Sequence, residues 1–166
     1  MKPAIKTAEC DVSVRLSGQY VAGFIDGEGC LRINRPRITK SGKIIQSTIS
    51  ISVSNTNYEI LAILKEMYGG SLIKTNRGPR CKDCFIWHIE AKKAERVLID
   101  IKDYLVIKRR QCEILMDFRT SLKNGNIMTR GLGHNRNPQK DKKILQFRSE
   151  AILKIDVLNK RGKDEL

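Results

Sequence analysis

The sequence predicts an α+β fold in which helices pack on a four-stranded antiparallel sheet, and three observations support this. Some segments carry apolar residues every three to four positions, whereas others alternate strictly between apolar and polar residues. These segments follow the order αββαββα, and turn residues join the strands within each pair. The 166 residues are also enough for one good core. A single domain is therefore expected over residues 13–166, with no clear element in residues 1–12.

The first half of the chain contains one helical and two strand segments. A helix is expected over residues 17–26, and from residue 29 the apolar period changes to two. A first strand over residues 31–34 is followed by a turn over residues 40–43 and a second strand over residues 45–54. In the second strand, the apolar set on the inner face is Ile45, Ile49, Ile51 and Val53. Polar residues occupy the other face, so the sheet is expected to have an apolar face and a polar face.

The second half repeats this order and then adds helices. A helix is expected over residues 58–68, ended by Gly69 and Gly70. A second hairpin has strands over residues 72–76 and 85–91, joined across residues 77–80. Further helices are expected over residues 93–104 and 108–122. A basic loop over residues 124–139 then leads into an amphipathic helix over residues 140–160.

The charge is strongly unbalanced and indicates a polyanionic partner. The chain has 32 Lys and Arg against 18 Asp and Glu, a formal net charge of +14 and a pI near 9.8. Such a charge is typical of nucleic-acid-binding proteins but names no reaction. No apolar run approaches the roughly 20 residues of a membrane helix, and no signal segment begins the chain. A soluble intracellular protein of a prokaryotic cytoplasm or an organelle is expected, without a membrane partner, and the terminal sequence Lys-Asp-Glu-Leu is interpreted as coincidence.

The five cysteines do not suggest a disulfide framework. Cys81 and Cys84 form a lone C-x-x-C pair, which fits half a zinc site, a redox pair, a local disulfide or two thiols in a hairpin. The two histidines, His88 and His134, lack zinc-finger spacing to the pair. Two thiols are the favoured interpretation, and their state is left open.

Residues 20–29, Tyr-Val-Ala-Gly-Phe-Ile-Asp-Gly-Glu-Gly, join an apolar helix to two carboxylates set among glycines. The C-terminal end of a helix carries a partial negative charge, which disfavours Asp26 and Glu28 unless a cation lies nearby. Mg²⁺ suits this position because it binds carboxylate and carbonyl oxygens, and Gly27 and Gly29 allow the backbone to turn toward it. The simpler alternative is a helix that ends in a turn with solvated acids.

Residues 22–29 resemble the LAGLIDADG motif of homing endonucleases and related maturases, and the resemblance extends from about residue 17 to at least residue 122. It implies the αββαββα homing-endonuclease fold, with a homodimer formed by chains that carry one motif each. It also implies an intron-encoded, site-specific endonuclease that breaks both strands of a long pseudo-palindromic DNA target. Mg²⁺ is the implied cofactor, with Mn²⁺ as an expected substitute. The alternatives are an RNA maturase that binds intron RNA and a catalytically inactive DNA-binding protein.

The resemblance also assigns catalytic roles to individual residues. Glu28 matches the second acid of the motif, which binds the metal together with a glycine carbonyl, here that of Gly27. Lys108 resembles the family's basic residue beside the catalytic water, although a basic cluster that binds phosphate is the alternative. Asn55 matches a polar position that organises water, where many relatives have Gln. Asp26 is expected to be structural, or a minor participant at the helix junction.

Two surfaces complete the predictions. The polar sheet face and the nearby hairpin are expected to contact DNA in the major groove, unless this is merely a solvated face. The residues of this DNA-binding set are Arg32, Asn34, Gln46, Thr48, Ser50, Ser52, Lys74, Asn76, Arg77 and His88. One face of the first helix carries small residues that permit close approach of a second copy. Its members are Gln19, Ala22, Gly23 and Asp26, the expected dimer interface.

Overall fold

The computed structural model describes residues 15–38, 40–41, 44–75, 82–124 and 138–160. The first half contains helix α1 (Gly18–Glu28), strands β1 (Gly29–Asn34), β2 (Arg37–Ile38), β3 (Ile44–Ile45) and β4 (Thr48–Asn55), and helix α2 (Tyr58–Tyr68). The second half contains β5 (Ser71–Thr75), β6 (Cys84–Glu90), α3 (Ala91–Ile101), α4 (Arg109–Asn124) and α5 (Pro138–Leu158). The N-terminal segment over residues 1–12, most of the basic loop, Cys81, His134 and the terminal Lys-Asp-Glu-Leu lie outside the described residues.

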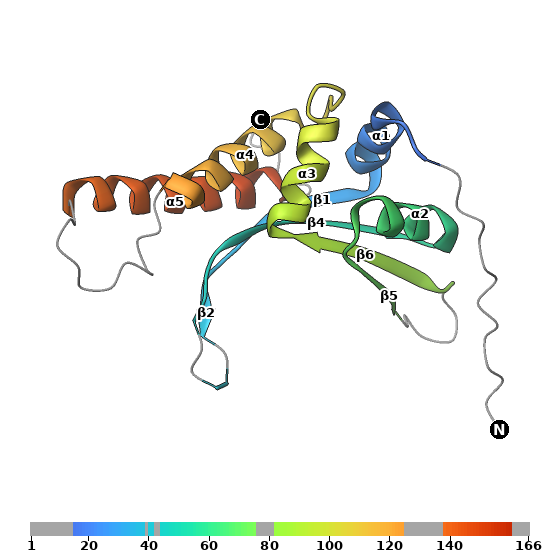
Figure 1. Cartoon of the computed structure of the whole chain (residues 1–166), viewed down its shortest axis with the longest axis horizontal. Coiled ribbons are helices and arrows are strands. Elements are labelled where there is room, and N and C mark those ends of the chain that lie inside the picture. Colours follow the sequence, from blue (N-terminus) through green and yellow to red (C-terminus); the bar gives the residue numbers. More distant parts are fainter. Residues whose placement is uncertain (1–14, 39, 42–43, 76–81, 125–137, 161–166) are drawn as a thin grey trace.

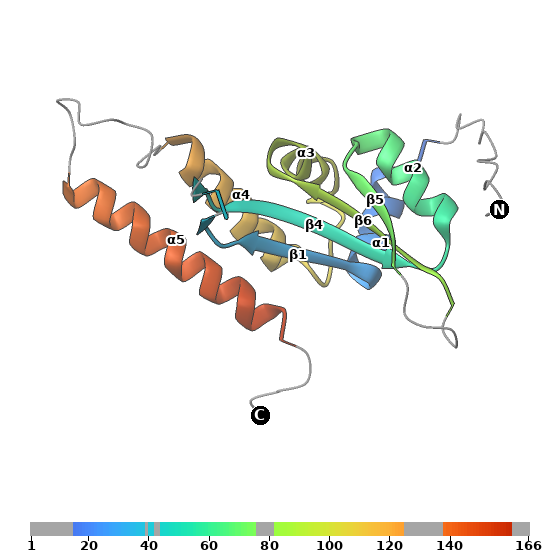
Figure 2. The ribbon, with the colours of Figure 1, turned by 90° about the horizontal axis from the view of Figure 1, so that it is seen from below.

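A four-stranded antiparallel sheet with strand order β1-β4-β6-β5 forms the centre of the molecule. Helices α1, α2 and α3 lie on one face of this sheet (Figure 1). Viewed from the opposite side, the described elements leave the other face open, and α5 runs beside β1 (Figure 2). The predicted α+β class and its antiparallel sheet are confirmed.

The first hairpin differs from the prediction at its tip. The second strand was expected to run unbroken from residue 45, but β4 begins at Thr48 and Ile44–Ile45 forms the separate strand β3. Strand β3 pairs with β2 in a small second sheet. Gln46 and Ser47 separate the two ladders, so the hairpin changes direction between the large sheet and its tip.

Local sequence signals set the helix ends. The side chain of Ser17 accepts a hydrogen bond from the Tyr20 amide at 3.2 Å, and Asn57 does the same for Ile60 at 3.3 Å. Both bonds satisfy amides that have no partner inside their helices. After α2, Gly70 has a φ of 95°, and a Cβ there would lie 2.5 Å from the His88 carbonyl oxygen. Only glycine fits this close approach to β6.

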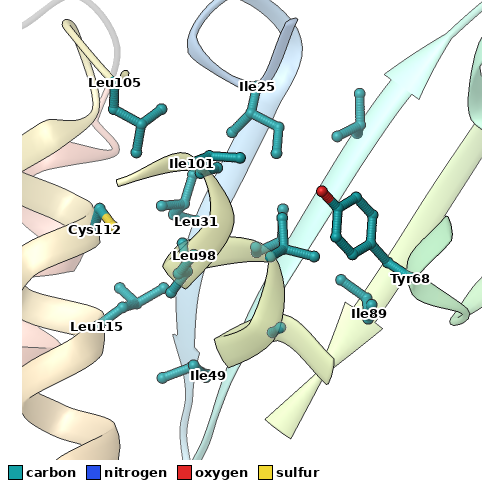
Figure 3. Close-up of a cluster of buried hydrophobic side chains, with 14 of the residues drawn as sticks. Ile25, Leu31, Ile49, Tyr68, Ile89, Leu98, Ile101, Leu105, Cys112 and Leu115 are labelled. Carbon is teal, nitrogen blue, oxygen red and sulfur yellow. The ribbon is translucent and has the colours of Figure 1, made fainter. Parts of the chain in front are cut away.

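The core lies between the inner sheet face and the helices. Leu31, Ile49 and Ile89 project from the sheet toward Ile25 of α1 and Leu98 of α3 (Figure 3). All five side chains are at most 1% exposed. Burial of such side chains is worth about 1.5–3 kcal/mol each, so the sheet and helices form one packed unit.

Polar contacts fix the outer helices. Glu95 of α3 accepts a hydrogen bond from Arg119 of α4 at 3.0 Å and another from Lys123. Helix α5 is held at the β1 edge by the Asn159 amide, which donates to the Leu31 carbonyl at 2.8 Å. None of the described helices is both long and apolar enough to span a membrane.

Candidate active site and nucleic-acid interface

Asp26 connects the end of α1 to the start of α4. Its carboxylate accepts hydrogen bonds from the amides of Val106 at 2.7 Å, Ile107 at 3.2 Å and Lys108 at 2.9 Å. The Lys108 ammonium in turn donates to the main-chain carbonyl of Asp26. Asp26 is only 8% exposed, so it is satisfied inside the protein and occupies the structural position expected for it.

These contacts explain how an acid is tolerated at this helix end. Three successive amides that point at one carboxylate form an anion-binding concavity, and they precede the N-terminus of α4, which also favours negative charge. The Lys108 ammonium lies at the C-terminal end of α1 and offsets the partial negative charge there. The cation that the sequence requires near the two acids is therefore supplied, at least for Asp26, by the chain itself.

Glu28 has the opposite surroundings. It is the last residue of α1, is exposed, and forms no hydrogen bond or ion pair with any described residue. It lines an open hollow of about 950 Å³ together with Asn55, Arg32 and Asn159. Glu28 and Asn55, two of the three predicted catalytic residues, therefore share one hollow. Lys108 does not line it and lies beside Asp26 instead.

The Asn55 side chain has a fixed orientation in this hollow. Its Oδ1 accepts a hydrogen bond from the Asn57 amide at 2.8 Å, just before α2 begins. This leaves the Asn55 amide nitrogen without a partner among the described residues. Asn55 can therefore donate a hydrogen bond into the space that Glu28 borders.

Asn159 lines the same hollow and was missed by the sequence analysis. It follows the end of α5, and its side-chain bond to Leu31 joins residues 128 positions apart. A single asparagine after an amphipathic helix gives no local signal of such a contact. Only the packing of α5 along β1 brings Asn159 near Glu28.

The polar face of the sheet carries most of the predicted DNA-binding set. In the ladder, Arg32 pairs with Ser50, and Ser50 pairs with Glu90. Arg32 and Gln46 are exposed, and the partly exposed members are Asn34, Thr48, Ser52 and His88. Ser50 is only 3% exposed and donates to the Asn34 Oδ1 at 3.2 Å. The expectation that Ser50 faces a ligand is therefore wrong. Ser50 is buried in the sheet, and its hydroxyl holds the Asn34 side chain in place.

Lys74 lies on the other face, and its predicted place on the polar face is wrong. The ladder pairs Lys74 with Phe85 and its neighbour Leu72 with Trp87. Directly paired side chains share a face, and Trp87 is fully buried on the helix-covered side. Lys74 there forms an ion pair with Asp83 at 2.5 Å. Asn76 and Arg77 lie outside the described residues.

Glu90 is the residue of this face that the sequence analysis did not assign. Its Oε1 accepts from the Asn34 amide at 2.9 Å and from the His88 Nε2 at 2.9 Å. Glu90, His88 and Asn34 line a hollow of about 350 Å³ together with Arg35 and Arg37. Glu90 is the one acid among the described residues that line this hollow, although Arg35 also pairs with Asp156 at 2.6 Å.

The exposed face of α1 differs from the predicted dimer interface. Ala22 is 0% exposed and belongs to the core, and Asp26 is engaged with α4, so neither lies on a free face. Gln19 and Gly23 are exposed as expected. Gly27 joins them, and a Cβ at Gly23 or Gly27 would meet nothing within 4 Å. Helical periodicity alone did not show which small residues pack inward.

Other metal or thiol chemistry finds no support in the described part of the chain. No group of three or more His, Cys, Asp and Glu is placed to hold a metal ion there. Cys84 is a buried free thiol, and burial raises the pKa of the Cys112 thiol to about 11. Cys112 is therefore protonated and unreactive near neutral pH.

Comparisons with known proteins agree with this geometry. A family model described as LAGLIDADG endonuclease matches residues 21–119, more than half of the chain. No curated protein matches the sequence. Among solved structures, the homing endonuclease I-CvuI in complex with its target is 21% identical with a TM-score of 0.64, over 90% of this chain and 85% of that chain.

Two further solved structures extend the similarity. The archaeal intron-encoded homing endonuclease I-Vdi141I, complexed with DNA, is 17% identical with a TM-score of 0.63, over 90% of this chain and 87% of that chain. I-SmaMI bound to an uncleaved DNA target is 19% identical with a TM-score of 0.62. That match covers 86% of this chain but only 46% of I-SmaMI. At these identities the structures show a shared fold.

Proposed function

This chain belongs to the LAGLIDADG endonuclease family, and we propose that it is an intron-encoded homing endonuclease that makes a metal-dependent double-strand break at a specific DNA site. The observation that carries the proposal is the position of Glu28. Its exposed carboxylate has no partner among the described residues, and it borders a hollow that opens onto the polar face of the sheet. A free acid beside a basic surface is suited to bind a cation next to a polyanion.

The open sheet face suits duplex DNA. It is long, polar and uncovered by any described element, and the whole chain carries a net charge of +14. The major groove admits such strands and presents a distinct pattern of donors and acceptors for each base pair. The related I-CvuI and I-Vdi141I structures contain DNA. We assign base contacts to Arg32, Gln46, Ser52 and His88, and phosphate contacts to the surrounding basic residues. Thr48 is not among them, because its hydroxyl oxygen is buried and does not reach the open side of the sheet.

The residues at the end of α1 fit Mg²⁺. This ion is usually held by one or two carboxylates while it keeps waters and binds substrate phosphate. Glu28 offers one carboxylate, and the carbonyl of Gly27 lies at a helix end where carbonyl oxygens lack partners. When bound, the ion would polarise the phosphate and lower the pKa of a bound water. Mn²⁺ accepts the same oxygen ligands.

Lys108 and Asn55 would assist the reaction from two sides. The Lys108 ammonium is held at the end of α1, where it is suited to stabilise the extra negative charge of the phosphate in the transition state. The Asn55 amide nitrogen is free to orient a water within the hollow beside Glu28. We propose these roles for the two side chains, with Asp26 as the residue that positions Lys108.

Two strands must be cut, whereas one chain carries one Glu28, so we propose a homodimer. The exposed glycines Gly23 and Gly27 allow a second α1 to approach closely, and Tyr20, 52% exposed, lies beside them on the helix. I-SmaMI is about twice as long as the matched region of this chain, so one I-SmaMI chain has room for two such folds. A twofold axis through the α1 pair would place one sheet on each half-site.

The test begins with selection of duplexes from a randomised library by the full-length protein in Ca²⁺. The selected duplex should then be cut on both strands in Mg²⁺ and left intact in EDTA. Glu28→Gln should bind it with nearly unchanged affinity and fail to cut it, because the change removes a metal ligand and keeps the shape. Glu66→Gln on α2 makes the same charge change away from the site and should cut normally.

Two outcomes would favour the alternatives. Selection of a duplex that is never cut in Mg²⁺ or Mn²⁺ would indicate an inactive DNA-binding protein. Failure to select any duplex, together with stimulated splicing of the host intron, would indicate an RNA maturase. Sedimentation of Gly23→Leu tests the dimer: the variant should fold but remain monomeric, because the added bulk lies outside its own chain.

A further inference from the structure

Glu90 presents an unusual acid on the proposed DNA-binding face. Phosphate groups of DNA carry negative charge and have no hydrogen to donate, so an ionised carboxylate gains nothing from the backbone. Glu90 nevertheless lies in the same hollow as Arg35, Arg37 and His88, and its side chain is 48% exposed. Of the groups that DNA offers, only the bases can donate a hydrogen bond to an acid in this place.

The two carboxylate oxygens of Glu90 have different surroundings. Both hydrogen bonds from the protein, from the Asn34 amide and from the His88 ring, end on Oε1 at 2.9 Å. Among the described residues, Oε2 has no partner. Because Glu90 is exposed, Oε2 is accessible from the open side of the sheet. One oxygen is therefore anchored and the other is available as an acceptor.

The anchor is itself fixed from three strands. Ser50 of β4 donates to Asn34 Oδ1 at 3.2 Å, and this bond sets the orientation of the Asn34 amide toward Glu90. His88 lies two residues before Glu90 on β6, and its Nε2 must carry a hydrogen to donate to the carboxylate. The side chain of Glu90 is thus turned across the sheet. It makes no capping bond to α3, although it occupies the N-cap position of that helix.

We infer that Glu90 is a specificity-determining residue that accepts a hydrogen bond through Oε2 from the exocyclic amino group of a cytosine in the major groove. Cytosine presents only a donor there, whereas adenine pairs its amino group with the N7 acceptor. Guanine and thymine present acceptors, which repel a carboxylate. Asn34 and His88 are positioning residues for this contact. The inference rests on the proposed DNA-binding function of the sheet face.

The experiment compares base preferences of the wild-type protein and its variants, selected from the same randomised duplex library in Ca²⁺. Wild type should show a strong cytosine preference at one position of each half-site. Glu90→Gln should lose this preference by about tenfold or more at that position alone, and gain adenine, which a glutamine can bind through two bonds. Asn34→Ala keeps the carboxylate but removes one anchor, so it should weaken the same preference without a gain of adenine.

Matched controls separate the possible outcomes. Glu66→Gln should leave every position unchanged, and Arg32→Ala should alter a different position, where a guanine is expected. Base preferences of Glu90→Gln that match those of wild type, or that weaken equally at all positions, would overturn the role of Glu90. A wild type that selects no sequence would instead refute the DNA-binding function itself, and the Glu90 assignment with it.

Discussion

Asp26 and Glu28 lie two residues apart at the end of one helix, yet their carboxylates have opposite surroundings. Asp26 is 8% exposed and accepts hydrogen bonds from the three successive amides of residues 106–108. Glu28 is exposed and has no partner among the described residues. One acid is satisfied by the protein, and the other remains available to a ligand.

The difference shows how a helix end can combine a structural and a chemical role. A buried carboxylate is tolerated only when it is hydrogen-bonded, so Asp26 requires the α4 amides and in return fixes where α4 begins. Glu28 is the last residue before β1 and is exposed at the edge of the hollow, so it does not need hydrogen bonds from the protein. Two acids of one motif therefore do not need to bind the same metal. Mutation of Asp26 should affect stability, and mutation of Glu28 should affect metal binding.

After Glu28 itself, the largest effect on the cleavage rate is expected at Lys108, which Asp26 positions. Lys108→Met should slow cleavage of bound DNA by about 100-fold or more, because it removes a charge aimed at the transition state. Single-turnover kinetics measure this rate apart from affinity. Arg110→Met, which changes an exposed cation two residues further along the chain, is the matched control. A normal rate with reduced affinity would leave Lys108 as a phosphate contact only.

The next effect is a difference in stability between variants of Asp26 and Glu28. Asp26→Ala should lower the free energy of unfolding by about 2–4 kcal/mol, because it leaves partly buried amides without their charged acceptor. Glu28→Ala should change it by less than about 0.5 kcal/mol. Urea denaturation of both variants gives the comparison. Equal losses in the free energy of unfolding would show that Asp26 does not have a structural role that Glu28 lacks.

A third acid extends the comparison to pH. Burial alone would raise the pKa of Glu95, but its hydrogen bonds from Lys123 and Arg119 outweigh burial and lower it. A lowered pKa means that the ionised acid stabilises the fold above its ordinary pKa of about 4.3, and that this contribution is lost as the pH falls through the lower value in the folded protein. Glu95→Gln should therefore cost about 1 kcal/mol near neutral pH.

The pH dependence supplies the check on Glu95. The gap between wild type and Glu95→Gln, measured by denaturation, should narrow as the pH falls below the ordinary pKa of glutamate and through the lower pKa of Glu95 in the folded protein. The exposed Glu113→Gln, beyond the first turn of α4, provides the control and should follow wild type throughout. A gap that stays constant with pH would mean that packing, and not the charge of Glu95, holds α3 to α4.

The smallest effect concerns a second junction between strand and helix. Ala91 follows β6 with a φ of 55°, a left-handed conformation that costs a residue with a Cβ about 1–2 kcal/mol. Ala91→Gly should therefore raise the free energy of unfolding by about 1 kcal/mol, whereas Asp26→Ala should lower it. Thermal denaturation measures this change, and a lower melting temperature would contradict the strain.

The fold was predictable because its signals are local. Asn57 and Gly69 mark the two ends of α2, and the predicted range 58–68 matches the structure. Alternation in β4 likewise separated Ile49, Ile51 and Val53 from the polar face. Such signals depend on residues that are close in sequence, so one chain contains them in full.

The candidate site was predictable only in part, because its remaining contacts depend on packing. Lys74 was assigned to the wrong face, since the register of an edge strand is set by its partner. Ala22 was assigned to a free helix face, although α1 buries it in the core. Glu90 and Asn159 acquire their positions from other strands and helices. No spacing rule links residues that are so far apart in the sequence.

We propose that Glu28 binds the metal whereas Asp26 is structural. The most direct test of this proposal is a titration of Mn²⁺ into the protein bound to its selected duplex, followed by electron paramagnetic resonance. This readout reports bound metal without requiring cleavage. Glu28→Gln should lose tight Mn²⁺ binding while it keeps the melting temperature of wild type. Asp26→Asn should melt at a lower temperature but keep the bound ion. Retention of tight Mn²⁺ by Glu28→Gln, with its loss in a folded Asp26→Asn, would contradict the account.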